Sequence, residues 1–173
     1  TDWLYRRLGL SRVYFSAFQP VPGTPLEGRP PSPPLREHRL YQSDILLREY
    51  GFSLDELPFG PSGNLPLGLD PKLAWALQHP EFFPLEVNRA SRWELLRVPG
   101  IGPKSASRII AFRINDKFHT LEQLKGVGVV VKRAAPFILV DGKPGTRLLH
   151  LPAKRSPISL ELPWDCLLYT SPS

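Results

Sequence analysis

The stretch LLRVPGIGPKSASRII, residues 95–110, is the most informative part of this chain. A short apolar run leads into the turn Pro-Gly-Ile-Gly, and a second run of helical spacing follows it. Pro99 disfavours helical geometry in the residue before it, so the first helix ends there. A second helix is expected over residues 103–115, with Ala106, Ile109 and Ile110 facing the first. The sequence therefore predicts two short helices joined by a glycine hairpin.

A looser copy of the same unit follows about 26 residues later. Thr120 and Gln123 have the spacing of a capping box, as Ser91 and Glu94 have before the first copy. The segment LKGVGVVVKRAAPFI then supplies a short helix, a glycine turn and an apolar segment. Four short helices can cover one another's apolar faces where one pair could not. We therefore expect a small helical domain over residues 89–140.

The rest of the chain indicates a connector rather than a second large domain. Residues 1–10 resemble the end of a helix that Gly9 stops, and SRVYFSAF, residues 11–18, alternates as a strand does. The prolines of residues 20–34 form no regular structure, and residues 35–50 have helical spacing. Asp70 and Pro71 suit the N-cap and first position of another helix. Residues 20–88 are therefore predicted to be a proline-rich linker and a helical connector, and residues 141–165 a tail.

The charge of the chain is concentrated in one segment. The net charge is +6, but residues 89–133 hold ten Lys or Arg against Glu94, Asp116 and Glu122, a balance of +7. A basic block of this kind favours a surface that binds a polyanion, although a solvated face has the same composition.

Cysteine content limits the chemistry of the chain. Its one cysteine, Cys166, begins CLLYTSPS, residues 166–173, which corresponds to a translation of the sequencing-adapter sequence TGTCTCTTATACACATCTCCGAGC. We expect that end to be an artefact. Without it the segment holds no thiol for a disulfide, a zinc-cysteine site or an iron-sulfur cluster.

The chain contains no membrane or export signal that the sequence reveals. No run approaches the eighteen or so apolar residues of a membrane span, and TDWLYRRLGL lacks the order of a signal peptide. We expect a cytoplasmic protein without a membrane partner. The chain opens without a methionine, and we expect it to be part of a longer protein.

The glycine hairpins have a chemistry of their own. A turn with small glycines exposes consecutive backbone amides, and the helix that begins beyond it adds the positive end of its dipole. An anion can approach such a turn without meeting a side chain. A tight turn between packed helices, with no ligand, would have the same pattern.

The first hairpin is similar to the helix-hairpin-helix motif of DNA repair and replication proteins, in which hairpin amides hold the backbone of duplex or junction DNA. The resemblance implies DNA as the partner. In that family the hairpin carbonyls also hold a monovalent cation, which here implies the carbonyls of Leu96, Val98 and Ile101. In the second copy Val131 stands where the first has Ser105, so contacts there depend more on side chains. The residues that the resemblance implies at the DNA are Gly100, Ile101, Gly102, Lys104, Ser105, Arg108, Gly126, Gly128, Lys132 and Arg133.

A wider resemblance covers most of the chain. VYFSAFQPVPGTPL, REHRLYQSDILLREYGF and LDPKLAWALQHPEFFPLEVNRA, with the hairpin region, look like the C-terminal portion of radical SAM proteins assigned to DNA modification or repair. In that family a barrel with a CxxxCxxC motif binds a 4Fe-4S cluster and S-adenosylmethionine upstream of the hairpins. Residues 1–19 would then be the last helix and strand of the barrel. The implied fold class is mainly α, a tandem helix-hairpin-helix domain preceded by a helical connector and by that strand.

The cluster cysteines are absent from this chain, so the resemblance implies no bound cofactor and no catalysis by this segment alone. It implies a DNA-docking region that holds the phosphate backbone while chemistry occurs upstream. Two other functions remain open. One is a DNA-processing enzyme in its own right, for which Glu37, His38, Asp44, Glu49, Asp55 and Glu56 are the candidate acid-base residues. The other is a protein-interaction or dimerisation module.

Overall fold

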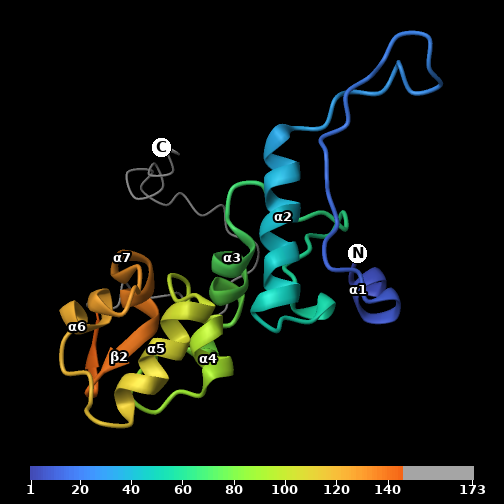
Figure 1. Ribbon diagram of the computed structural model, residues 1–173. Helices are drawn as coiled ribbons and strands as arrows, with labels where there is room; N and C mark the ends of the chain where they lie inside the picture. Colours follow the sequence, from blue (N-terminus) through green and yellow to red (C-terminus); the bar gives the residue numbers. More distant parts are fainter. Residues whose placement is uncertain (146–173) are drawn as a thin grey trace.

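The computed structural model describes residues 1–145 of the chain. A compact group made of α4 to α7 and a small sheet lies beside the long helix α2, with α3 between them and α1 on the far side of α2 (Figure 1). The predicted adapter-derived end, residues 166–173, and residues 146–165 of the predicted tail lie outside the described residues. In chain order the elements are α1 (Asp2–Leu8), α2 (Pro34–Glu49), η1 (Leu54–Glu56), α3 (Pro71–Gln78), η2 (Pro80–Phe82), β1 (Leu85–Glu86), α4 (Arg92–Arg97), α5 (Pro103–Arg113), α6 (Leu121–Gly126), α7 (Val131–Ala134), η3 (Ala135–Phe137), β2 (Ile138–Val140) and β3 (Lys143–Pro144).

Residues 11–18 do not form the predicted strand. They pair with no strand in the described chain, and the amides of Val13, Phe15 and Ala17 donate instead to side chains of α1 and α2. The Phe15 amide donates to the Tyr41 hydroxyl at 3.0 Å, and the Ala17 amide donates to the Glu37 carboxylate at 2.8 Å. Alternating side chains predict an extended backbone, whereas a strand also needs a neighbouring strand. The prediction that residues 11–18 form a strand is therefore wrong in this structure, while the assignment of residues 1–19 to the end of a barrel stays a prediction.

The helix boundaries of the connector follow their local signals. Gly9 ends α1 in the left-handed region, with φ 62°. The Asp70 side chain accepts a hydrogen bond from the Leu73 amide at 3.0 Å and so caps α3, as predicted. None of the described helices is long and apolar enough to cross a membrane.

The two hairpin units also begin where the sequence predicts. In α4 the Glu94 amide donates to the Ser91 hydroxyl at 3.2 Å, and the Ser91 amide donates to the Glu94 carboxylate at 2.6 Å. Thr120 and Gln123 form the same reciprocal box before α6. The core of this domain consists of fully buried residues from all four helices and the loops between them: Leu95, Val98, Ile101, Ala106, Ile109, Phe118, Leu124 and Ala134.

A three-stranded sheet closes the hairpin domain, and the sequence did not reveal it. β1 runs parallel to β2, and β3 runs antiparallel to β2, in the order β1-β2-β3. Asp141 and Gly142 make the turn between β2 and β3 with φ 54° and 73°. Because β1 and β3 lie outside residues 89–140, the sheet extends the packed unit beyond the predicted bounds at both ends.

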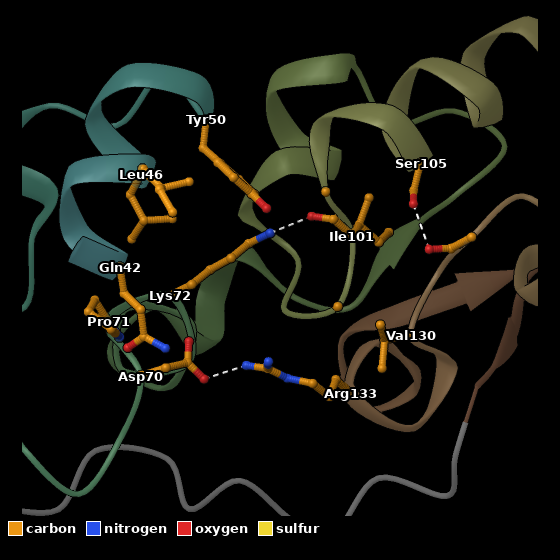
Figure 2. A pocket seen from close by; sticks show the side chains of 14 residues that line it. Gln42, Leu46, Tyr50, Asp70, Pro71, Lys72, Ile101, Ser105, Val130 and Arg133 are labelled. Carbon is orange, nitrogen blue, oxygen red and sulfur yellow. Dashed lines mark hydrogen bonds and ion pairs between the residues drawn. The ribbon is translucent and has the colours of Figure 1, made fainter. Parts of the chain in front are cut away.

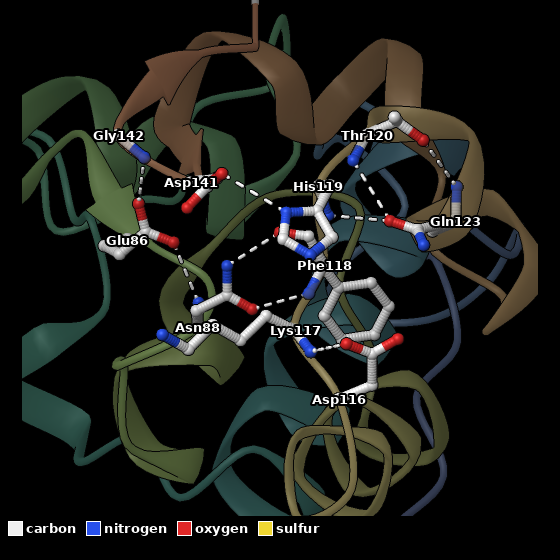
Figure 3. A network of polar contacts seen from close by, with 10 residues as sticks. All are labelled: Glu86, Asn88, Asp116, Lys117, Phe118, His119, Thr120, Gln123, Asp141 and Gly142. Carbon is white, nitrogen blue, oxygen red and sulfur yellow. Dashed lines mark hydrogen bonds and ion pairs between the residues drawn. The ribbon is translucent and has the colours of Figure 1, made fainter.

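Asn88 ties the loop between the two hairpin units to this sheet (Figure 3). Its side-chain amide donates to the Phe118 carbonyl at 2.8 Å and its side-chain oxygen accepts from the Phe118 amide at 2.8 Å. The Gly142 amide donates to the Glu86 carboxylate at 2.8 Å on the same side. This loop therefore lies at the β1 end of the domain, and the two hairpins lie at the opposite ends of their helices.

Arg97 joins the connector to the hairpin domain. Its side chain is fully buried and donates to the Glu56 carboxylate at 2.8 Å and to the carbonyls of Tyr50 and Gly51 at 3.1 Å. The guanidinium also lies 3.9 Å from the centre of the Phe52 ring. Breaking such a buried pair costs several kcal/mol because it leaves an uncompensated charge. Arg97 belongs to the predicted basic block, but it is unavailable to a ligand.

Candidate nucleic-acid interface

The two hairpins share one backbone conformation in a register that differs from the predicted repeat. Gly100 and Gly128 occupy the left-handed region with φ 86° and 89°. Two residues later Gly102 and Val130 are the N-caps of α5 and α7. The structural repeat is therefore 28 residues, not about 26. In this register Lys132 is equivalent to Lys104, and it is Arg133, not Val131, that takes the place of Ser105.

The hairpins lie side by side and exchange hydrogen bonds. The Val130 amide donates to the Gly100 carbonyl at 2.9 Å, and the Ser105 hydroxyl donates to the Gly128 carbonyl at 2.7 Å. A Cβ at Gly100 would lie 2.6 Å from the Val130 carbonyl oxygen, closer than real Cβ atoms come. Glycine at this position thus allows the second hairpin to approach the first.

The predicted DNA-contacting residues fall into two groups. Ile101 and Ser105 are buried, and their side chains hold the hairpins together instead of facing solvent. Gly100 and Gly102 are partly buried, and Arg133 forms an ion pair with Asp70. The exposed members are Lys104, Arg108, Gly126, Gly128 and Lys132, together with the paired Arg133.

Two connector residues cover part of the first hairpin (Figure 2). The Lys72 ammonium donates to the Ile101 carbonyl at 2.6 Å and lies 4.5 Å from the centre of the Tyr50 ring. The Tyr50 hydroxyl lies 3.3 Å from the position of a Cβ at Gly102. Sequence reasoning missed both residues, because Lys72 stands in an ordinary first helical turn and Tyr50 in an ordinary last one.

The environment of Lys72 disfavours its charge. Burial lowers the pKa of Lys72 to about 7, and the positive charges of Arg133 and Arg97 act in the same direction, while the Asp70 carboxylate opposes them. A charged ammonium still has two further donors beyond the one that Ile101 accepts.

The predicted cation site shares two of its three carbonyls with internal hydrogen bonds. That of Ile101 accepts from the Lys72 amino group at 2.6 Å, and that of Val98 accepts from the Ile101 amide at 3.2 Å. A cation at the carbonyls of Leu96, Val98 and Ile101 stays a prediction, and at Ile101 it would have to displace Lys72.

The basic block is smaller than the sequence count suggests. Arg97 is buried, Arg133 is paired with Asp70, and Arg113 donates to the carbonyls of Val87 and Ala90 at 2.9 and 2.7 Å. The other seven basic side chains of residues 89–133 are exposed: Arg89, Arg92, Lys104, Arg108, Lys117, Lys125 and Lys132. A basic surface remains, and part of it lies at the hairpins.

Three of the six candidate acid-base residues of the connector serve structural contacts. Asp44 is buried and accepts hydrogen bonds from the Tyr5 hydroxyl and, at 2.9 Å, from Arg48. Glu56 pairs with Arg97, and Glu37 accepts from Ala17. Over residues 1–145, no three His, Cys, Asp or Glu side chains are grouped so that they could hold a metal ion. Among the described residues, these contacts assemble no active site of the kind that a DNA-processing enzyme would need.

Comparison with known proteins supports the hairpin interpretation. Residues 84–134 match the family model of the helix-hairpin-helix motif. The matched segment contains β1 and both hairpins, and it ends at the last residue of α7. No curated protein and no solved structure shows significant similarity to the chain. The prediction of a helix-hairpin-helix motif is confirmed, and the motif points to nucleic acid as the ligand.

Proposed function

We propose that the hairpin domain binds the phosphate backbone of DNA without reading its sequence. The observation that carries this proposal is the equivalence of Lys104 and Lys132. Both are exposed, and each is the second residue of the helix that follows its glycine turn. Because the two turns lie side by side, each of these exposed lysines belongs to a helix that begins at one of two adjacent turns.

The chemistry of the turns suits phosphate rather than bases. Gly126 and Gly128 are exposed and carry no side chain that would keep an anion from the backbone. Hydrogen bonds to phosphate position a protein on DNA but carry no sequence information. Ile101 and Ser105 are buried, so neither is available to read a base edge.

The experiment is fluorescence anisotropy of a labelled short duplex titrated with the full chain, with Lys104→Glu and Lys132→Glu as variants. Each charge reversal should weaken binding by about tenfold, roughly equally for unrelated duplex sequences. Lys117→Glu is the matched control. It makes the same charge change beyond the far end of α5, a helix of 11 residues and roughly 16 Å.

Equal losses in all three variants would mean that net charge alone attracts DNA and would contradict the proposed site. Concentration-dependent self-association without DNA binding would favour the dimerisation module instead.

We also infer that this domain docks DNA for a radical SAM enzyme acting in DNA repair or modification. The support is the resemblance of residues 13–26, 36–52 and 69–90, together with the hairpin region, to the C-terminal portions of such proteins. The residues that the structure describes include no cysteine, so they do not fit a 4Fe-4S cluster. The test is the upstream reading frame, where a CxxxCxxC motif in a barrel domain is expected. An upstream domain of another class would overturn the inference.

A further inference from the structure

A pocket of about 400 Å³ lies between α2, α3 and the two hairpins (Figure 2). Both hairpins line it, the first with Gly100 and Gly102 and the second with Gly128 and Val130. The pocket lies between the connector and both turns, and neither Lys104 nor Lys132 lines it. It is therefore distinct from the exposed positions of those two lysines.

Three charged side chains meet in this pocket. Lys72 is 8% exposed and belongs to α3, Arg133 belongs to α7, and Asp70 is the N-cap of α3. The Arg133 guanidinium is paired with one oxygen of Asp70, while the other oxygen accepts from the Leu73 amide at 3.0 Å. Arg133 is therefore paired with Asp70, whereas the Lys72 amino group donates to the Ile101 carbonyl and forms no ion pair with that carboxylate.

We propose that this pocket binds one phosphate group of a nucleic acid, held by Lys72 and Arg133, and that Asp70 occupies Arg133 until the phosphate displaces it. The proposal rests on the proposed function and adds the connector to the interface. The phosphate is either an internal one of the backbone or one at a strand end.

The contacts allow this exchange without repacking the core. Lys72 uses one ammonium donor on Ile101, and two remain for an anion in the pocket. The Arg133 side chain is 49% exposed, so it can turn from Asp70 to a ligand without leaving a buried site. Asp70 keeps its cap on α3 through the oxygen that accepts from Leu73. When Arg133 turns away from Asp70, the negative charge of the phosphate takes the place of the negative charge of the carboxylate as its partner.

In the first test the full chain is titrated with inorganic phosphate, and binding is monitored by NMR through the backbone amide resonances of Gly102 and Ser105. Asp70→Asn removes the competing charge but keeps an N-cap side chain of equal quality. It should tighten phosphate binding about fivefold, the effect of one neighbouring charge near a protein surface. Lys72→Met should weaken binding by at least as much. Asp55→Asn is the matched control, because Asp55 is exposed on η1 and does not line the pocket.

The proposal would be overturned if phosphate shifts the same resonances in wild type and in both pocket variants and binds all three proteins with equal affinity. Equal shifts with chloride at the same ionic strength would indicate an adventitious ion only and would overturn it as well. If Lys72→Met does not fold, the phosphate affinity of Asp70→Asn decides. A tighter affinity than that of wild type supports the proposal, and an unchanged or weaker affinity overturns it.

A second titration separates this proposal from the proposed function and identifies the source of the phosphate. Two duplexes are compared, one with 5′-phosphate ends and one with 5′-hydroxyl ends. Tighter binding of both by Asp70→Asn indicates an internal phosphate, and tighter binding of the first alone indicates a terminal one. Duplex binding that neither Asp70→Asn nor Lys72→Met changes would overturn the pocket and leave the function of the hairpins intact. Phosphate binding in the pocket without any duplex binding would overturn the proposed function, and with it the nucleic-acid source of the phosphate.

Discussion

The first and second hairpins have the same turn but different surroundings. Gly100 and Gly128 share one backbone conformation, and each hairpin hydrogen-bonds the other. The first hairpin also packs against the connector through Lys72 and Tyr50, whereas Gly128 and Val130 of the second are exposed. A repeated sequence therefore sets the turn, and the neighbouring elements decide how much of each turn a ligand can reach.

The largest expected difference in stability between the two hairpin units is at Arg97 and at Lys125, its equivalent in the 28-residue repeat. Arg97→Met should lower the free energy of unfolding by about 3 kcal/mol, because Glu56 and two carbonyls lose their buried donor. Lys125→Met, at an exposed position, should change it by less than about 0.5 kcal/mol. Urea denaturation of both variants measures the difference, and similar losses in the two would contradict the assigned role of Arg97.

A smaller difference is expected between the two turn glycines. Gly100→Ala places a Cβ 2.6 Å from the backbone oxygen of Val130, so it should cost about 2 kcal/mol through strain and displacement of the second hairpin. At Gly128 a Cβ meets only side-chain ends, those of Arg108 and Ser105, at 3.3 Å. Gly128→Ala should therefore cost about 1 kcal/mol, from its positive φ alone. Equal losses in urea denaturation would mean that the hairpins are not in the contact described.

The pH dependence of stability should distinguish the first hairpin, which Lys72 contacts, from the second hairpin. Burial lowers the pKa of Lys72 to about 7 from its ordinary value of 10.5. Between these values the unfolded chain holds a proton that the folded chain has released, so the free energy of unfolding should rise as the pH rises through this interval. Lys72→Met should remove that part of the rise, while Lys132→Met should not. Parallel pH profiles for wild type and Lys72→Met would contradict the assigned environment.

Local signals in the sequence were enough to predict much of the fold. The capping boxes of Ser91 and Thr120, the cap at Asp70 and the stop at Gly9 each depend on a few neighbouring residues, and all are confirmed. The strand over residues 11–18 was wrong because alternation does not reveal whether a pairing strand exists. The sheet was missed because β1 and β3 have two residues each and β2 has three, too few for a period to appear.

The candidate site was harder to predict than the fold. Glycine spacing located both turns, but the register of the second became clear only from the positive φ of Gly128. Counting charges treated Arg97 and Arg133 as part of a free basic surface, although one is buried and the other is paired. Lys72 reaches the first hairpin, and Asp70 reaches Arg133 of α7, only after α3 packs between α2 and the domain, and no local pattern encodes those contacts.

The most direct test of the central claim is the salt dependence of duplex binding in the double variant Lys104→Glu/Lys132→Glu. Each phosphate contact contributes about 0.9 to the slope of log affinity against log salt. The slope should fall by about 1.8 relative to wild type if both lysines meet phosphates. The charge-matched control Arg89→Glu/Lys117→Glu changes residues at the opposite end of the domain and should leave the slope nearly unchanged. Equal reductions in the two double variants, or none in the first, would contradict the assignment of the two hairpins as the DNA-binding face.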